Sequence, residues 1–449
     1  MTTALKASHV VSEDPAISQL YHRLNWRILP LLAICYFFAC LDRLNISFAK
    51  LQMQTDLSFS DAVYGLGAGI FFIGYVLFEI PSNLMLPKVG ARRTLSRIMV
   101  LWGLTSAGMM FVNSEPMFYC LRFLLGVFEA GFAPGMIFYL TYWYGKVRMG
   151  RALALVLMAG PISGVVSGPL STWLMTAFDG VLGLGGWRWL FLVEGLPSVA
   201  LGVLVWFVLA DKPGAARWLT SHERQLLERH KEPASSAKHH SFKDVLSDPR
   251  IYVMAAAYFC LVCGLYTISF WLPSILRANG VSNTLHIGFY STIPYIGAIV
   301  GMTLVSRSSD KRQERRWHST VAALVGGVCL GLATLASGNL FASIAFITVA
   351  TLSMYAAYSV FWTIPSQYLK GDVAAGGIAL INTIGLFGGF CSPTIIGWAT
   401  SATGSLHAGL YVMTGLLLMG GVLLATLRLP KAGQGQPDLP LPSMADTQL

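Results

Sequence analysis

Twelve long apolar stretches dominate this sequence of 449 residues. Each has few charged side chains and reaches the roughly 20 residues that an α-helix needs to cross a bilayer. The stretches cover residues 27–49, 62–86, 94–113, 117–143, 152–178, 188–209, 250–276, 286–306, 317–337, 339–364, 373–400 and 405–428. The sequence therefore predicts an all-α membrane protein with twelve transmembrane helices.

The composition excludes the other broad classes of protein. Only 12% of the residues are charged and 55% are hydrophobic, whereas soluble domains average about 25% charged residues. Disordered chains combine low hydrophobicity with high net charge. Transmembrane β-barrels show short alternating segments rather than long apolar runs. Neither description fits this chain.

Cysteine and histidine usage argues against redox, metal or enzyme chemistry. The seven cysteines all lie inside apolar stretches and are odd in number, so we expect free thiols rather than a disulfide framework. The nine histidines lie in tails, loops or near predicted helix ends, where they form no catalytic set. The phosphate-binding motif G-x-x-x-x-G-K-[ST] is also absent, so we expect no use of ATP. We therefore expect neither enzyme activity nor a metal or organic cofactor.

The distribution of basic residues predicts the topology. Most of the 31 Lys and Arg residues fall in alternate loops, on the side that also carries both termini. Because basic loops are retained in the cytoplasm, we predict cytoplasmic termini, and we attribute the net charge of +10 to topology rather than to nucleic-acid binding. The expected parts are a tail (1–26), a six-helix bundle (27–210), a cytoplasmic loop (211–249), a second six-helix bundle (250–428) and a tail (429–449).

The two predicted bundles repeat a short basic loop. Residues 88–93 (KVGARR) follow the second helix, and residues 310–316 (DKRQERR) follow the eighth. Two parallel six-helix repeats around a central site are a known transporter plan. We predict that Arg92 and Arg93, with Asp310 and Arg316 as their repeat counterparts, pair with helix ends and act as a gate at the cytoplasmic rim. In the central loop, Thr220 and Glu223 predict a capping box at the start of a short helix.

Four further motifs resemble one transporter family. They are residues 41–49 (LDRLNISFA), 78–84 (FEIPSNL), 122–131 (RFLLGVFEAG) and 186–191 (GWRWLF). Together they resemble the anion:cation symporter family of the major facilitator superfamily, which includes bacterial tartrate, phthalate and galactonate permeases. The resemblance implies the major facilitator fold, a bacterial inner membrane location, and alternating access that couples a small organic anion to protons. We expect a monomer in the lipid bilayer, with the proton as the coupling ion.

Six ionisable residues lie within the predicted helices. They are Asp42, Arg43, Glu79, Arg122, Glu129 and Glu194. A charge at mid-membrane costs about 2.5 kcal/mol or more unless it is paired or hydrated, so each of these residues is a functional hypothesis. Arg122 and Glu129 are seven residues apart and share a helix face.

The arginines and two of the carboxylates predict an anion site with proton coupling. We predict that Arg43 and Arg122 bind the substrate, because a guanidinium group grips a carboxylate through two hydrogen bonds and stays charged. Asp42 and Glu129 are the predicted proton acceptors. In the empty carrier we expect Asp42 beside Arg43 and Glu129 beside Arg122. The resemblance implies the same roles. The alternative is a set of structural ion pairs between the first and fourth helices.

Two other carboxylates lie nearer the membrane surfaces. We expect Glu79, at the cytoplasmic end of the second helix, to form a structural or gating ion pair. We expect the same of Glu194, which lies close to Arg188 at the outer end of the sixth helix.

The second bundle has no charge deep within its helices. The resemblance places Tyr75, Ser359, Trp362 and Asn382 at the substrate site. Asn382 is also favoured independently, because an amide inside an apolar run needs a hydrogen-bond partner.

The expected substrate is a small carboxylate with few hydroxyl groups. Residues 152–168 and 252–271 contain no Asn or Gln, and a polyol chain would need such groups. This favours a hydroxy-dicarboxylate such as tartrate, or an aromatic carboxylate such as phthalate. The alternatives are a sugar-acid (aldonate or hexuronate) symporter, an anion exchanger or facilitator with the same fold, and a carboxylate sensor.

Overall fold

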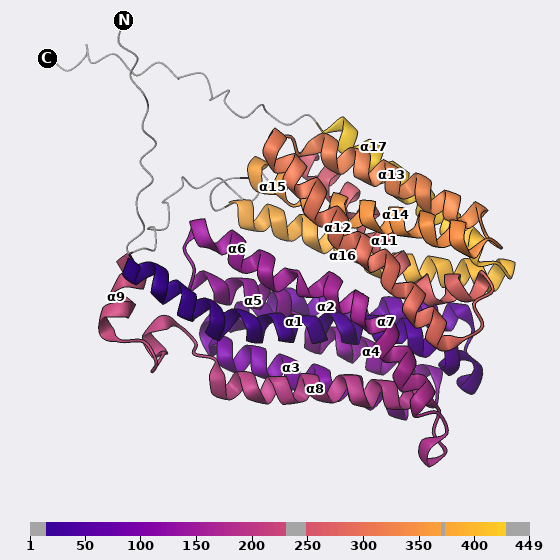
Figure 1. The fold of residues 1–449 in the computed structure, drawn as a ribbon, viewed down its shortest axis with the longest axis horizontal. Helices are drawn as coiled ribbons and strands as arrows, with labels where there is room; N and C mark the ends of the chain where they lie inside the picture. Colours follow the sequence, from indigo (N-terminus) through magenta and orange to yellow (C-terminus); the bar gives the residue numbers. More distant parts are fainter. Residues whose placement is uncertain (1–14, 230–247, 370–372, 428–449) are drawn as a thin grey trace, which may run out of the picture.

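The computed structural model describes residues 15–229, 248–369 and 373–427, and these residues form helices without strands. The first bundle contains α1 (Pro15–Leu57), α2 (Asp61–Val89), α3 (Ala91–Gly108), α4 (Glu115–Glu129), α5 (Phe132–Thr141), α6 (Lys146–Leu157), α7 (Ala159–Ala177) and α8 (Gly186–Val208). The second contains α11 (Pro249–Ala278), α12 (Thr284–Arg312), α13 (Arg316–Leu335), α14 (Leu340–Phe361), α15 (Thr363–Tyr368), α16 (Val373–Thr403) and α17 (Leu406–Thr426). The bundles lie side by side with their long helices roughly aligned (Figure 1).

The helices agree with the predicted twelve-span architecture. Within the described residues, eleven helical segments are long and apolar enough to cross a membrane. The remaining predicted span corresponds to α3, whose first turns carry Arg92, Arg93 and Arg97 and which is therefore less apolar. The predicted all-α membrane fold is confirmed.

Some helix boundaries differ from the prediction. Helix α1 already begins at Pro15, well before residue 27, because its first turns pack on Tyr144, which follows α5. The Tyr21 ring lies 6.0 Å from the ring of Tyr144, and Tyr144 Oη donates to Asn25 Oδ1 at 2.9 Å. Of the predicted N-terminal tail (1–26), residues 15–26 are therefore helical, while residues 1–14 lie outside the described residues. The predicted C-terminal tail (429–449) and the loop segment 230–247 also lie outside them.

The predicted span 117–143 is interrupted. Helix α4 ends at Glu129, and α5 begins at Phe132. The break occurs because Gly131 has a φ of +87°, a left-handed conformation that side chains rarely adopt. Within a membrane, such irregular backbone is tolerated where it is buried in protein or lines a polar site. The break therefore leaves Glu129 at the end of a half-helix.

The central loop contains the predicted capping box. Thr220 N donates to Glu223 Oε2 at 2.9 Å, and Glu223 N donates to Thr220 Oγ1 at 3.2 Å. They begin α9 (Ser221–Arg229), as expected. Arg23 of α1 forms an ion pair with Glu223, so this helix is attached to the first bundle.

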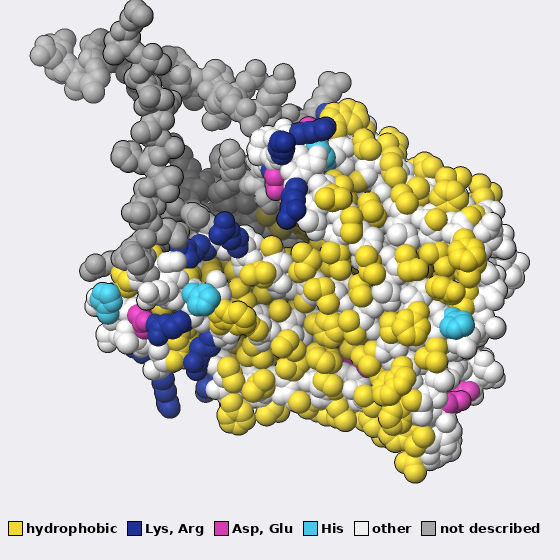
Figure 2. Space-filling model, viewed as in Figure 1, with side chains coloured by type: hydrophobic (Ala, Val, Ile, Leu, Met, Phe, Trp, Pro, Cys, Tyr) yellow, Lys and Arg dark blue, Asp and Glu magenta, His cyan; other side chains and the backbone are white. Residues whose placement is uncertain are grey.

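Basic side chains gather at one end of the molecule (Figure 2). We call this the basic end; it carries the exposed residues Lys88, Arg93, Arg97, Lys311 and Arg312 and the beginning of α1. The other end, which we call the opposite end, carries the loops after α1, α7 and α11. Contacts between the bundles connect α2 with α16, α7 with α12, and α1 with α11.

Candidate functional site

Arg43 lies where the two bundles meet. Its Nη2 atom forms an ion pair with Glu129 Oε1 of α4, and its Nη1 atom donates to Tyr266 Oη of α11 at 3.1 Å. The guanidinium carbon lies 5.3 Å from the ring centre of Phe71 and 5.6 Å from that of Tyr75, both on α2. Arg43 thus joins three helices of the first bundle to the second bundle.

The Arg43–Glu129 pair leaves polar atoms unused. Arg43 Nε and Glu129 Oε2 are buried without a hydrogen-bond partner among the described residues. The Arg43 side chain is 24% exposed, whereas that of Glu129 is 3% exposed. Unpaired buried polar atoms are costly, so this ion pair has hydrogen-bonding capacity that the described residues do not use.

Arg122 has a different environment from the one predicted. Its Nε donates to the Gly67 carbonyl at 3.1 Å and its Nη2 to the Ala68 carbonyl at 3.3 Å, and the residue is 1% exposed. Its expected partner, Glu129, is instead paired with Arg43.

This correction has a physical reason in the packing of α2 on α4. A Cβ atom at Gly126 would lie only 1.9 Å from the Phe71 carbonyl oxygen, so the two backbones touch at this glycine. The close approach brings the α2 carbonyls within reach of Arg122. Both arginines still contact the same ring, since the Arg122 guanidinium lies 5.2 Å from the ring centre of Phe71.

Asp42 faces the interior of the first bundle, away from the Arg43 cluster. Its carboxylate accepts hydrogen bonds from Trp102 Nε1 at 2.7 Å, Ser198 Oγ at 2.8 Å and Ser106 Oγ at 3.1 Å. Asp42 is 1% exposed, and it has no ion pair within the described part of the chain. The expected Asp42–Arg43 pair is therefore wrong, because consecutive residues of a helix point about 100° apart.

Glu79 and Asn382, predicted for separate roles, contact each other. Asn382 Nδ2 of α16 donates to Glu79 Oε1 of α2 at 3.2 Å. Glu79 therefore has an amide partner rather than the expected cation. The contact crosses between the bundles, on the basic-end side of Arg43.

Glu194 does not pair with Arg188. Arg188 donates to the Met110 carbonyl, whereas Glu194 accepts from Ser171 Oγ at 2.8 Å and is 1% exposed. The expected ion pair is wrong because the Glu194 side chain turns into the bundle rather than toward its surface.

The other predicted lining residues lie on both bundles. Tyr75 packs 6.0 Å from Phe71 beside Arg43. Trp362, at the junction of α14 and α15, lies 4.8 Å from the ring of Tyr258. Ser359 Oγ is 3.0 Å from Ser306 Oγ of α12. Their role at a substrate site stays a prediction.

The predicted gate residues make their contacts within their own bundles. The backbone N–H of Arg92 donates to Asp211 Oδ1 at 2.9 Å, and Arg93 is exposed. Asp310 forms an ion pair with Arg315, and Arg316 donates to the Ala425 carbonyl in the last turn of α17. Arg316 thus meets the end of α17, and the Arg92 guanidinium carbon lies 5.3 Å from the ring centre of Trp206 near the end of α8. The gating role stays a prediction.

Lys50 was not singled out from the sequence. This buried lysine near the opposite end pairs with Asp61 Oδ1 at 2.7 Å and donates to Ser274 Oγ of α11 at 3.0 Å. Its Nζ lies 3.8 Å from the ring centre of Trp271 and 4.7 Å from that of Tyr64. We call Lys50, Asp61, Tyr64, Trp271 and Ser274 the opposite-end seal. The sequence offers one signal for this ion pair: Lys50 precedes the loop between α1 and α2, and Asp61 follows it.

Most hydrogen bonds between the bundles lie on this side. Besides the seal's own contacts, Tyr64 Oη donates to the Phe270 carbonyl at 2.8 Å, Arg277 to the Leu51 carbonyl at 2.9 Å and the Ala62 N–H to Ser401 Oγ at 2.9 Å. Toward the basic end, the last hydrogen bond between bundles in the described regions is Glu79–Asn382. The structure therefore represents a form closed at the opposite end.

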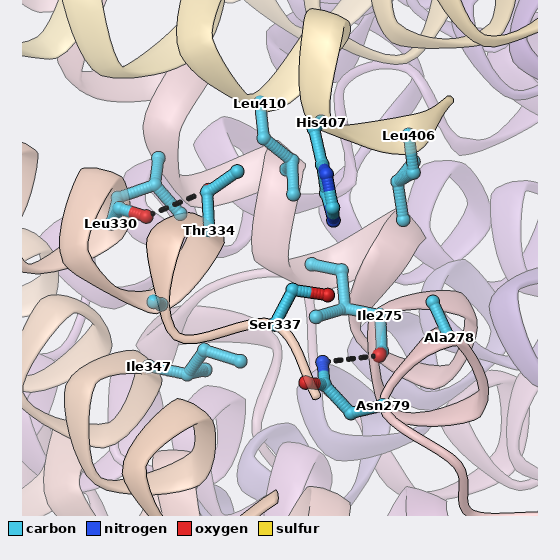
Figure 3. A pocket seen from close by; sticks show the side chains of 11 residues that line it. Ile275, Ala278, Asn279, Leu330, Thr334, Ser337, Ile347, Leu406, His407 and Leu410 are labelled. Atoms are coloured by element: carbon cyan, nitrogen blue, oxygen red, sulfur yellow. Dashed lines mark hydrogen bonds between the residues drawn. The ribbon is translucent and has the colours of Figure 1, made fainter. Parts of the chain in front are cut away.

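A separate pocket lies inside the second bundle, at the opposite end (Figure 3). His407, Asn279 and Thr334 contribute polar groups to it, but Asn279 and Thr334 already donate to the Ile275 and Leu330 carbonyls. None of the predicted site residues lines this pocket, so it lies apart from the Arg43 cluster.

Known proteins resemble this chain over most of its length. The family model for the Major Facilitator Superfamily matches residues 32–393. A Pseudomonas putida protein named as the metabolite transport protein NicT is 42% identical, with 92% of this chain and 95% of the relative covered. An Agrobacterium vitis protein named for tartrate transport is 43% identical, with coverages of 91% and 95%. The crystal structure of a D-xylose-proton symporter superposes with a TM-score of 0.72 at 14% identity, covering 89% of this chain and 97% of the symporter.

Proposed function

The chain belongs to the major facilitator superfamily and is a membrane transporter rather than an enzyme; from this premise we propose that it carries a small organic anion in symport with protons. The observation that carries the proposal is the Arg43–Glu129 pair with its unused polar atoms, located between the two bundles. The Agrobacterium vitis relative is named for tartrate transport, which supports an organic anion as the substrate.

Arg43 is the proposed anion-binding residue. It combines a permanent positive charge with partial exposure and a free Nε donor, and a guanidinium group binds carboxylates through paired hydrogen bonds. Because Arg43 also donates to Tyr266 of the second bundle, an anion bound to Arg43 is linked to both bundles through this one side chain. Arg122, which donates to two backbone carbonyls, supports this site by placing a second positive charge near Phe71.

Glu129 is the proposed link between the anion and a proton. It occupies the guanidinium group that an arriving carboxylate needs, so anion and Glu129 compete for Arg43. Once displaced, Glu129 is a buried carboxylate without its cation, a state that strongly favours protonation. Proton binding then cancels the added charge before the loaded carrier changes conformation, which links the two ligands thermodynamically.

Alternating access follows from the distribution of contacts between the bundles. Seal contacts at the opposite end break and new contacts form at the basic end as one bundle rocks against the other. We place the basic end in the cytoplasm of a bacterial cell, following the bias of Lys and Arg, with both termini there and the chain acting as a monomer in the inner membrane.

The aromatic surroundings of the site favour the proposed substrate classes. Tyr266 packs 4.5 Å from Phe72 and 5.6 Å from Phe270, and Tyr258 stacks on Phe361 at 5.1 Å. Most of these rings are themselves buried, so they make the surroundings of Arg43 apolar and poor in hydrogen-bond donors. We therefore propose a hydroxy-dicarboxylate such as tartrate or an aromatic carboxylate such as phthalate.

Uptake into proteoliposomes tests the proposal. Purified protein is reconstituted and offered labelled tartrate or phthalate, with and without a pH gradient that is alkaline inside. We expect accumulation of one of the two above its external concentration only with the gradient, and counterflow without it. Accumulation that is indifferent to the pH gradient would replace symport by facilitated diffusion or exchange, and absence of transport and of binding for both would remove the substrate assignment.

A further inference from the structure

Glu194 is a buried carboxyl group that the mechanism above does not use. One oxygen accepts from Ser171 Oγ of α7 at 2.8 Å, and the other, Oε2, is buried without a partner among the described residues. No Lys, Arg or His forms an ion pair with it in the regions that the structure describes.

A second unpartnered polar group lies next to it. Asn45 of α1 is fully buried, and neither its Nδ2 nor its Oδ1 has a hydrogen bond among the described residues. On α1, the Asn45 amide and the Asp42 carboxylate are the polar groups close enough to interact electrostatically with the Glu194 carboxyl group. The Asn45 amide and the second Glu194 oxygen therefore lie within interaction range of each other, and with Asp42 they form a cluster of buried polar groups inside the first bundle.

Helix α8 connects Glu194 to Asp42. Ser198 follows Glu194 by one helical turn and lies on the same face, and its hydroxyl donates to Asp42 Oδ2 at 2.8 Å. Helix α8 begins at the opposite end, so Glu194 lies one turn closer to that end than Ser198 and Asp42 do. Asn45, one turn beyond Asp42 on α1, lies at the corresponding level.

The helices packed around Glu194 present few other titratable groups. Helix α7 (Ala159–Ala177) contains none. On α3 the titratable residues are Arg92, Arg93 and Arg97, in the first turns at the basic end. On α8 itself Arg188 is bonded to the Met110 carbonyl. Asp42 is therefore the titratable group that faces Glu194, and two such carboxyl groups without a cation cannot both remain ionised in a dry interior.

The Ser171 partner connects Glu194 to the moving interface. Ser171 belongs to the part of α7 that packs on α12: a Cβ atom at Gly168 would lie 2.3 Å from the Gly288 carbonyl oxygen, and Thr292 Oγ1 donates to the Val165 carbonyl at 3.1 Å. When the bundles separate at the opposite end, α7 loses this cover. The surroundings of Glu194 thereby change with the conformation of the carrier.

We propose that Glu194 is a second proton site, which receives protons from the opposite end and passes them to Asp42 through the Ser198–Asn45 region. In each transfer the O–H bond of Glu194 breaks as one forms on the Asp42 carboxylate. Glu194 is then reprotonated from water at the opposite end, and nothing is oxidised or reduced. The inference rests on the proposed proton symport for its purpose, but the proton on Glu194 can be detected without transport.

Infrared difference spectroscopy tests the proton itself. Anion-free reconstituted protein is compared between acidic and neutral pH, and the carbonyl stretch of protonated carboxyl groups is recorded. We expect Glu194→Gln to remove one buried carboxyl band that wild type shows, and Glu194→Asp to shift that band. Glu115→Gln, at an exposed carboxylate, is the matched control and should leave it unchanged. A band that is identical in wild type and Glu194→Gln would overturn the proposal.

Transport tests the relay. With labelled tartrate or phthalate, Glu194→Gln should slow gradient-driven uptake by about tenfold or more, since a positioned acid–base group contributes about 10²–10⁴ where nothing replaces it. Counterflow should stay near the wild-type rate. Loss of the band with normal gradient-driven uptake would overturn the relay. A wild-type protein that shows the Glu194 band but no proton-driven accumulation would instead remove the proposed symport, so the two failures are distinguishable.

Discussion

Asp42 and Arg43 are neighbours in the sequence but occupy different parts of the molecule. Arg43 lies between the bundles, is 24% exposed, and contacts Glu129 and Tyr266. Asp42 lies inside the first bundle, is 1% exposed, and is held by three neutral donors. Two opposite charges that could neutralise each other are kept apart by the geometry of one helix.

This separation assigns different ligands to the two faces of α1. The Arg43 face combines positive charge, exposure and contact with both bundles, which suits an anion. The Asp42 face excludes water and offers only hydroxyl and indole donors, which suits a proton but leaves no room for a carboxylate. Coupling between the two ligands therefore has to pass through α1 and through Glu129 rather than through a shared atom.

The largest expected effect comes from changing the Arg43 face. Arg43→Lys keeps the charge but replaces a planar group with five N–H donors by an ammonium group with three. The lysine cannot contact Glu129 and Tyr266 and also grip a carboxylate through two parallel hydrogen bonds. Losing one partner of a buried charged contact costs about 2–5 kcal/mol, so we expect anion affinity to fall by roughly a hundredfold or more. Ligand-induced thermal shift with tartrate and phthalate measures this loss.

Arg122→Lys is the matched control for this change. It alters an arginine near the same ring, but one whose donors go to backbone carbonyls. We expect a lower melting temperature with a smaller loss of affinity than in Arg43→Lys. Equal losses in both variants would show that the two arginines act as one clamp, as the sequence suggested.

The next effect concerns the carboxylate shared by both faces. Glu129→Gln mimics the protonated state and releases Arg43, so the anion should bind as tightly as in wild type or more tightly, and counterflow should persist. Accumulation driven by a pH gradient should disappear. Proteoliposome uptake measured both ways separates these outcomes, and weaker anion binding in this variant would mean that Glu129 is a substrate contact.

A smaller effect is expected at the opposite-end seal, which lies between the two bundles, as Arg43 does, and not inside the first bundle with Asp42. Lys50→Met keeps the length of the side chain and removes its ion pair and its contacts with the Trp271 and Tyr64 rings. Such contacts are worth about 1–2 kcal/mol when desolvated, enough to shift the population toward a form open at this end. Labelling of a cysteine placed near Ser274 should become faster, and an unchanged rate would contradict the seal.

The smallest effect concerns Glu314, a carboxylate between α12 and α13 and outside the membrane. Like Asp42 it is held by hydrogen bonds from neighbouring groups, so it serves as a comparison for Asp42 in an exposed setting. Burial raises the pKa of Glu314, but this is outweighed by hydrogen bonds from the Trp317 N–H, the His318 ring and the His318 N–H, so its pKa is lowered. Its stabilising contribution is therefore present above the pKa of the unfolded chain and is lost as the pH falls through the folded pKa. Glu314→Gln should cost less than about 1 kcal/mol at neutral pH and nothing at acidic pH, as measured by thermal unfolding; a pH-independent difference would contradict this.

The sequence predicted the features that depend on local pattern. Apolar runs gave the spans, and the Thr220–Glu223 spacing gave a capping box that the structure contains. The charged residues around Arg43 and Asp42 were all identified from the sequence, because each lies inside an apolar stretch.

Partner choice could not be predicted, because it depends on how helices are rotated against one another. The contact at Gly126 directs Arg122 to backbone carbonyls, and the break at Gly131 leaves Glu129 at a helix end facing Arg43. Lys50 was missed because α1 extends to Leu57, past the predicted end of the span. Such pairings depend on long-range packing that no spacing within one helix encodes.

The most direct test of the two-face arrangement is Asp42→Asn in proteoliposomes, because this residue touches no part of the Arg43 cluster. Anion affinity, counterflow and gradient-driven accumulation are measured on the same preparation with labelled tartrate or phthalate. We predict affinity within about twofold of wild type, retained counterflow, and no accumulation when the pH gradient is the only driving force, since removal of a coupling group changes linkage rather than binding. If Asp42→Asn still accumulates the anion against its gradient, Asp42 is structural and the assignment of protons to this face of α1 is wrong.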